Sequence, residues 1–126
     1  MEFIDEKIEQ YAELHTSNEP YYLEELNRET QQKVLMPRML SGHLQGRILS
    51  MLSKLKQPKR ILEIGTYTGY SALCLAEGLV KEGKLHTIDR NEELAGIVNK
   101  YVALAKMEDK IELHIGNALE IIPTLN

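Results

Sequence analysis

The sequence predicts an α/β protein of the doubly wound, Rossmann-like type, in which parallel strands alternate with helices. Three apolar segments, at 61–65, 85–89 and 111–115, have the length and composition of short buried strands, and helical patterns separate them. The first of these strands runs into a glycine-spaced turn, Gly65-Thr66-Tyr67-Thr68-Gly69, and then into a helix. A strand, a glycine turn and a helix in this order are typical of the place where such a fold binds a nucleotide-like cofactor.

Helices are expected before the alternating region. Apolar residues recur at helical spacing from Ile4 and again from Tyr22, and we expect both helices to cover the core. A third helix ends before Pro58 and carries a strong apolar stripe. The residues of this stripe are Leu44, Ile48, Met51, Leu52 and Leu55. We therefore divide the chain into N-terminal cover helices over 1–57 and a βαβαβ unit over 58–126.

Three helical segments are expected within the βαβαβ unit. The first spans about 70–82 and is closed by Gly83, and the second spans about 92–106 and is capped by Asn91. A short helical turn follows the last strand, before Pro123. Helices of this kind connect parallel strands, so the pattern indicates the first three strands of a doubly wound sheet.

The glycine turn also limits the kind of ligand. A dinucleotide site needs G-x-G-x-x-G, and its middle glycine, which makes room for a pyrophosphate, is replaced here by Tyr67. Glu63 places a carboxylate where a phosphate would be repelled but a sulfonium, an ammonium or a ribose hydroxyl would be attracted. The pattern therefore favours S-adenosylmethionine over NAD or FAD.

Acidic and small residues at the ends of the next two strands agree with this interpretation. Asp89 lies 20 residues after Gly69, near the offset of roughly 20 residues at which an acid binds ribose hydroxyls. With Glu63 it would form a clamp for the ribose. The third strand ends in Gly116-Asn117-Ala118, a turn small enough for adenine to approach the main chain. Three strand ends are thus expected to meet at one crevice.

Composition excludes several other classes of protein. The chain has 126 residues and a net charge of −4, which gives no basic footprint for nucleic acid. It has no apolar run near 18 residues and no visible signal peptide, so we expect no membrane partner. Its single cysteine, Cys74, fits a reducing cytoplasm, and we expect it to serve packing. The apolar edge of the strand at 61–65 favours self-association, and a homodimer is expected.

Metal binding is not expected within this chain. The four histidines lack any metal-ligand spacing such as H-x-x-x-H. They are His15, His43, His86 and His114. Of these, only His43, beside Ser41, is placed near the cofactor.

Together these motifs resemble the cation-dependent O-methyltransferases, the family that includes the catechol and caffeoyl-CoA O-methyltransferases. The resemblance rests on Met39-Leu40-Ser41, Gln45-Gly46, Leu62-Glu63-Ile64-Gly65-Thr66-Tyr67-Thr68-Gly69-Tyr70-Ser71, Asp89 and Gly116-Asn117-Ala118. The intervals between these motifs match the family without insertion. The resemblance therefore covers nearly the whole chain.

The resemblance implies cofactor contacts at named positions. In such enzymes Ser41 and Ser71 would hold the methionine carboxylate, and Glu63 and Asp89 would hold the ribose region. Ala118 would contact adenine through its backbone. Gly65 and Thr66 complete the implied cofactor-binding set. The implied reaction is transfer of a methyl group from S-adenosylmethionine to a hydroxyl of a catechol-like or other small phenolic acceptor.

The chain departs from the family after its third strand. The Asp-Ala-Asp-Lys-like segment and the later Asp-Asn pair, which carry the metal ligands and the catalytic lysine in such enzymes, do not occur before Asn126. We therefore expect the chain to be the cofactor-binding portion, with no catalytic residue of its own and no activity alone. A divalent metal, Mg²⁺ by first choice, is expected for the full-length enzyme.

Three alternatives stay open at this stage. The acceptor could be a hydroxylated uridine of tRNA, although the acidic composition favours a small molecule. A nonenzymatic module that binds S-adenosylmethionine or adenosine would keep the same acidic clamp. A small NAD domain would need an altered turn that tolerates Tyr67, and titration with NADH against S-adenosylmethionine would separate these two ligands.

Overall fold

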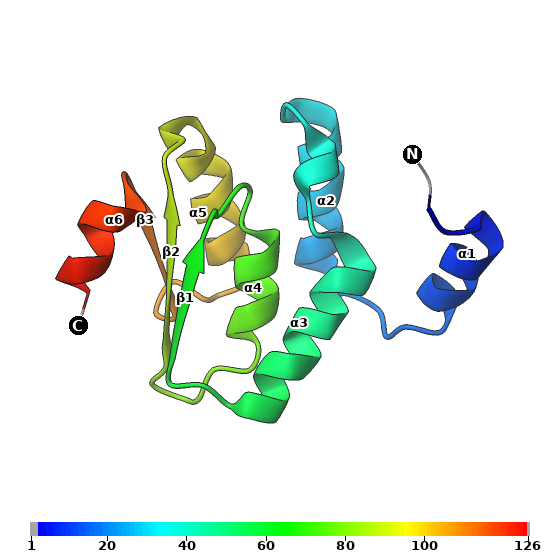
Figure 1. The fold of residues 1–126 in the computed structure, drawn as a ribbon, viewed down its shortest axis with the longest axis horizontal. Coiled ribbons are helices and arrows are strands. Elements are labelled where there is room, and N and C mark those ends of the chain that lie inside the picture. Colours follow the sequence, from blue (N-terminus) through cyan, green and yellow to red (C-terminus); the bar gives the residue numbers. More distant parts are fainter. Residues whose placement is uncertain (1–2, 126) are drawn as a thin grey trace.

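The computed structural model describes residues 3–125 and has an α/β architecture (Figure 1). Its strands are β1 (Arg60–Ile64), β2 (Lys84–Asp89) and β3 (Ile111–Ile115). The helices are α1 (Glu6–Leu14), α2 (Tyr21–Lys33), α3 (Gly42–Lys56), α4 (Tyr70–Ala76), α5 (Ala95–Leu104) and α6 (Ala118–Ile121). Short 3₁₀ turns are η1 (Pro37–Met39), η2 (Glu92–Leu94) and η3 (Ile122–Thr124). Each predicted strand is found within one residue of its expected bounds.

The three strands form one parallel sheet in the order β1-β2-β3. Ile61 pairs with Leu85, and Leu85 pairs with Ile111 on its other side. Helices α4 and α5 lie against one face of this sheet, with α2 and α3 outside α4, and α6 lies on the opposite side (Figure 1). The sheet is thus of the Rossmann-like type that the sequence predicts, and β1 lies at its edge.

The core fills the space between the sheet and the helices α2, α4 and α5. The sheet contributes Leu85 and Ile111, which are buried among side chains of these helices. The largest helical side chains of the core that are fully buried are Leu23, Leu26, Tyr70, Leu73 and Val98. Cys74 is buried among them as a free thiol, and burial raises its pKa to about 12. Its expected packing role is consistent with this position.

The helix expected over about 70–82 ends earlier than predicted, at Ala76. The cause is a tertiary contact at Gly78, where a Cβ would lie 2.2 Å from the carbonyl carbon of Ser53. The Ser53 hydroxyl also donates to the carbonyl of Leu75 at 2.5 Å. The backbone of α3 therefore lies directly against the segment after α4, and the chain turns away there.

The N-terminal helices do not all cover the core in the expected way. α2 buries Leu23, Leu26 and Thr30, as a cover helix should, but α1 buries no residue and extends away from the rest of the fold (Figure 1). In α3, four residues of the predicted apolar stripe are more than half exposed: Ile48, Met51, Leu52 and Leu55. The face that α3 buries consists of small residues instead, Gly46, Ser50 and Ser53.

Small residues on α3 are needed because α4 lies so close. A Cβ at Gly46 would lie 2.6 Å from a ring carbon of Tyr70, so no larger residue fits there. Across the same contact, Arg47 donates to both carboxylate oxygens of Glu77, at 2.7 and 3.2 Å, and Ser50 donates to Glu77 at 2.6 Å. Close packing and a nearly buried ion pair, not the apolar stripe, attach α3 to the core.

The remaining connections agree with the sequence. Asn91 caps the expected helix by accepting from the backbone N–H of Glu93, although the first turn, η2, is 3₁₀ and α5 begins at Ala95. The short helical turn expected after β3 and before Pro123 is α6, which ends at Ile121, and Pro123 lies in the 3₁₀ turn η3 that follows it. No helix among residues 3–125 is both long enough and apolar enough to cross a lipid bilayer.

Candidate functional site

The carboxyl ends of the three parallel strands meet at one edge of the sheet, and the candidate site lies there. β1 ends at Ile64, β2 at Asp89 and β3 at Ile115. The turns after them are joined by backbone hydrogen bonds, from Gly65 to the Ile88 carbonyl and from Gly116 to the Asp89 carbonyl, both at 2.8 Å. Ligands of open α/β sheets bind outside such strand ends.

The turn after β1 depends on glycine at two positions. Gly65 and Gly69 have φ of 95° and 93°, a region in which a side chain is strained. Apart from its chain neighbours, no atom lies within 4 Å of the place where a Cβ of Gly65 would be. The backbone at Gly65 therefore borders open space, and a ligand can approach it closely.

Asp89 is held at the end of β2 by two backbone amides. Its Oδ2 accepts from the N–H of Tyr67 at 2.9 Å, and its Oδ1 accepts from the N–H of Asn91 at 2.9 Å. A carboxylate oxygen can accept more than one hydrogen bond, so each oxygen keeps capacity for a ligand hydroxyl. The carboxylate is thus fixed in orientation but still available.

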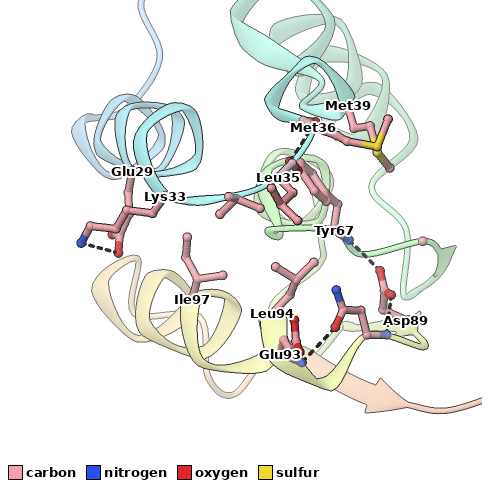
Figure 2. A pocket seen from close by; sticks show the side chains of 13 residues that line it. Glu29, Lys33, Leu35, Met36, Met39, Tyr67, Asp89, Glu93, Leu94 and Ile97 are labelled. Carbon is pink, nitrogen blue, oxygen red and sulfur yellow. Dashed lines mark hydrogen bonds and ion pairs between the residues drawn. The ribbon is translucent and has the colours of Figure 1, made fainter.

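Two cavities meet at Asp89 and Gly65, which line both of them. The larger, of about 660 Å³, lies between the glycine turn, α5 and the segment after α2 (Figure 2). Its walls include Leu35, Met36, Met39, Tyr67, Leu94 and Ile97. The smaller, of about 430 Å³, is lined by the turn 116–118 together with Ile64, Ile88 and Arg90. Ala118, the expected adenine contact, lies in this second cavity.

Glu63 lies at the centre of a hydrogen-bond chain beneath the turn. Ser71 donates to its Oε2 at 2.6 Å and Thr87 donates to its Oε1 at 2.7 Å. Because the Thr87 proton is used in this way, Thr66 is the donor in its 2.6 Å contact with Thr87. The side chains of Glu63, Thr66 and Ser71, all expected cofactor contacts, therefore belong to one chain of hydrogen bonds, in which Thr87 links Thr66 to Glu63.

The protonation of Glu63 is sensitive to its surroundings. Burial raises the pKa of this carboxyl above its ordinary value, although the hydrogen bonds from Ser71 and Thr87 oppose the effect, and the charge of Asp89 raises the pKa further. None of Glu63, Thr66 and Ser71 lines either cavity beside Asp89. In this arrangement the hydrogen-bond chain supports the turn from below, and Asp89 and Gly65 face the open space.

Ser41 and His43, the residues at the start of α3 that are expected near the cofactor, line neither of the two cavities beside Asp89. Ser41 precedes α3 without a side-chain capping bond and lines neither cavity, whereas Met39 lines the larger one. His43, expected near the cofactor, is hydrogen-bonded at 2.7 Å to the carbonyl of Ser17 and faces a separate depression beside α2. Gly42, which lies between these two residues, has a φ of 79°, a conformation that favours glycine.

Sequence reasoning missed the role of Tyr67 as a tether. Its hydroxyl lies 2.9 Å from the carbonyl of Leu35 and 3.0 Å from that of Met36, so it holds the segment after α2 over the glycine turn (Figure 2). Leu35 and Met36 are 88% and 52% exposed and form the apolar wall of the cavity. An apolar Val-Leu-Met run just before Pro37 was the available signal.

Fold and site together define the Rossmann-like methyltransferase class, with a glycine turn after β1 and an acid at the end of β2. Residues 13–126 match the family model described as O-methyltransferase. The chain belongs to this O-methyltransferase family.

Individual proteins that this chain resembles are O-methyltransferases as well. A catechol O-methyltransferase of Niastella koreensis is 34% identical over 90 residues, which cover 71% of this chain and 41% of the relative. An O-methyltransferase of Bacillus cereus solved in complex with SAH superposes with a TM-score of 0.85 at 30% identity, over 94% of this chain and 53% of that one. TomG of Streptomyces achromogenes, solved with SAM, superposes with a TM-score of 0.85 at 32% identity, over 95% of this chain and 53% of that one.

The chain spans less than half the length of the first curated relatives it matches, 41% of the catechol O-methyltransferase and 31% of a transmembrane O-methyltransferase of Propithecus coquereli. The family match over residues 13–126 includes the glycine turn and Asp89 at the end of β2. Statements about acceptors, partners and the activity of the whole protein are therefore proposals.

Proposed function

We propose that this chain binds S-adenosylmethionine at the carboxyl edge of its sheet, as part of an enzyme that methylates a hydroxyl of a catechol-like or other small phenolic acceptor. The observation that carries the proposal is the position of Asp89. It lies between two cavities, beside the open backbone of Gly65, with both oxygens oriented by backbone amides. A fixed carboxylate with spare acceptor capacity suits a ribose diol.

The chemistry of the lining residues supports this ligand over a phosphorylated one. The larger cavity contains Glu29, Asp89 and Glu93, and its one cation, Lys33, is paired with Glu29 at 3.4 Å. Such a lining attracts a sulfonium and an α-amino group and repels a pyrophosphate. Tyr67, held over the turn by its tether, fills the position that a dinucleotide would need empty.

The residues can be assigned distinct tasks within this proposal. Bound S-adenosylmethionine supplies an electrophilic methyl group on sulfur. Asp89 would hold the ribose and Gly65 would allow close approach of the ligand to the backbone. The backbone of Ala118 would contact adenine. Glu63, Ser71, Thr66 and Thr87 would keep the turn in shape, and Leu35 and Met36 would exclude water from one side.

The acceptor and the metal belong to the proposal for the whole protein. Among residues 3–125, the strand ends offer no cluster of three His, Cys, Asp or Glu side chains that would fit a divalent ion. No step is therefore assigned to a metal here, although we propose that the whole protein uses a divalent cation such as Mg²⁺. A homodimer and a cytoplasmic location complete the proposal, supported by the exposed edge strand β1 and the reduced, buried Cys74.

Calorimetric titration of the chain with S-adenosylmethionine and, separately, with NADH tests the cofactor. We expect saturable 1:1 binding of S-adenosylmethionine and no measurable heat with NADH. Preference for NADH would overturn the proposal. For the whole protein, transfer of labelled methyl groups to a panel of catechols, with and without EDTA, tests the acceptor. A tRNA substrate in the same panel separates the small-molecule acceptor from the hydroxyuridine alternative.

A further inference from the structure

We propose that His86, Glu112 and His114 form a binding site for Zn²⁺ on the face of the sheet opposite the helices α4 and α5. This site goes beyond the proposed methyl transfer and uses different residues. Nδ1 of His86 lies 2.9 Å from Nε2 of His114. Oε2 of Glu112 lies 3.6 Å from the first of these nitrogens, and Oε1 of Glu112 lies 3.9 Å from the second.

The backbone explains why the three side chains converge. His86 of β2 and Glu112 of β3 are direct partners in the parallel ladder, so their side chains lie side by side on one face. His114 follows Glu112 by two residues and therefore points to the same face. The expected absence of metal ligands rested on spacing along one helix, and spacing of that kind cannot detect ligands that come from neighbouring strands.

The separations suit a metal ion. Four ligands placed 2.0–2.1 Å from Zn²⁺ in a tetrahedron have donor atoms about 3.3 Å apart. The two nitrogens are 2.9 Å apart, and one donor atom from each of the three side chains lies within 4.8 Å of the other two, so small side-chain rotations would bring all three to this spacing. Three protein ligands leave the fourth position for water, as in open His₂Glu sites.

The donor set also selects the class of cation. Two imidazoles and one carboxylate favour Zn²⁺ and similar transition metals, whereas Mg²⁺ requires oxygen ligands in an octahedron. The imidazoles are about one fifth exposed and the Glu112 side chain is 59% exposed, so an ion can enter from solvent. The site is therefore distinct in chemistry from the Mg²⁺ proposed for the whole protein.

The proposed zinc site lies on a face of the sheet, apart from the carboxyl ends of the strands where the cofactor is proposed to bind. Leu85 and Ile111 point into the core between sheet and helices, and side chains alternate along a strand, so His86 and Glu112 point the other way. Leu62, the ladder partner of His86 on β1, is 48% exposed on this same face. An ion there would join β2 to β3 without contacting Asp89.

Titration of the metal-free chain with ZnCl₂, followed by calorimetry, tests the site. We expect one tight equivalent per chain, and Co²⁺ should give the absorption bands of a tetrahedral site. His86→Ala and His114→Ala should each weaken Zn²⁺ binding by about 100-fold or more, since even the loss of an outer partner costs about 10- to 100-fold. His15→Ala is the matched control, because His15 caps the C-terminal end of α1, where it bonds to the Tyr11 carbonyl and stacks on the Tyr11 ring, and it should leave the affinity unchanged.

The outcome against the proposal is equally definite. Unchanged Zn²⁺ affinity in both β-strand variants, or equal weakening by the His15 control, would overturn it. If the alanine variants fail to fold by circular dichroism, imidazole NMR of the unaltered chain decides instead. Zinc should then shift the ring signals of His86 and His114 and leave those of His15 and His43 in place. Cofactor titration is a separate measurement, so failure here leaves the proposed function standing.

Discussion

The backbone N–H of Tyr67 donates to Oδ2 of Asp89 at 2.9 Å and so joins the turn after β1 to the end of β2. Tyr67 has a φ of 51°, a left-handed conformation that is uncommon for a residue with a side chain. The same residue holds Leu35 and Met36 through its hydroxyl. Tyr67 therefore connects Asp89, the glycine turn and the wall of the larger cavity, through its backbone amide and its hydroxyl.

Replacement of Asp89 should weaken binding of S-adenosylmethionine. We expect Asp89→Ala to cost about 1.5 to 3 kcal/mol of binding free energy, because charge-assisted hydrogen bonds to the ribose are lost. Asp89→Asn keeps an oxygen that can accept from the Tyr67 amide but loses the negative charge. Its affinity therefore shows how much of the lost binding comes from the charge and how much from lost support of the turn. Asp109→Ala, an exposed acid away from the cavities, is the control. A dissociation constant for Asp89→Ala equal to that of the unaltered chain would remove Asp89 from the site.

Two glycines should respond in opposite directions to alanine. In Gly78→Ala the new methyl group would lie 2.2 to 2.4 Å from the backbone of Ser53 and Lys54, so α3 must shift. We expect a loss of about 1 to 3 kcal/mol or more in the free energy of unfolding. Gly96→Ala meets nothing within 4 Å in α5, and it should stabilise the chain by up to about 1 kcal/mol. Urea denaturation of both variants checks the contrast, and equal effects would mean that α3 does not pack as described.

The ion pair between Arg47 and Glu77 should be important for stability. Both side chains are about nine-tenths buried, and Arg47→Ala would leave the carboxylate of Glu77 with only Ser50 and Lys54. Removing one partner of a buried pair costs about 3 to 5 kcal/mol. The control is Arg28→Ala, which breaks a pair that is 65% exposed on both sides and should cost less than about 1 kcal/mol. Similar midpoints in urea for both variants would contradict the prediction.

Acid should destabilise the chain partly through Glu29. Hydrogen bonds from Lys100 and then Tyr101 lower the pKa of this carboxyl from 4.5 to about 2. A lowered pKa in the folded state stabilises the fold above pH 4.5, and this contribution is lost as the pH falls from 4.5 toward 2. Glu29→Gln should therefore flatten the fall in stability across that interval. Thermal unfolding at several pH values measures the slope, and Lys100→Ala should flatten it in the same direction.

The strands were predictable because local sequence determines them. The segments 61–65 and 85–89 contain apolar residues that favour strands, and each ends at a glycine or an aspartate. Because one face of each strand must be buried, the sequence also restricts the register in which the strands pair. The position of Asp89 followed from the same logic, since the end of a parallel strand determines the edge at which its last side chain lies.

The errors concern features that depend on contacts distant in sequence. The early end of α4 depends on Gly78 against Ser53, and the inward face of α3 depends on a pair, Arg47 and Glu77, 30 positions apart. The apolar stripe of α3 was visible as hydrophobic periodicity, but the tight approach at Gly46 selects small residues for the face that α3 buries. The bond from Thr87 to Glu63 depends on the pairing of β1 with β2, which places these two residues side by side.

The parallel sheet has a consequence for the kinetics of folding. β2 pairs with both neighbours, and its ladder partners are distant in the chain, 24 positions from Ile61 to Leu85 and 26 from Leu85 to Ile111. No hairpin can nucleate this sheet, so a loop of that size must close before the first ladder bond forms. Folding is therefore expected to be slower than in a helical bundle of the same length. Until β2 is in place, the apolar strands on both sides of it remain without hydrogen-bond partners, and this is the interval in which the chain is most exposed to aggregation.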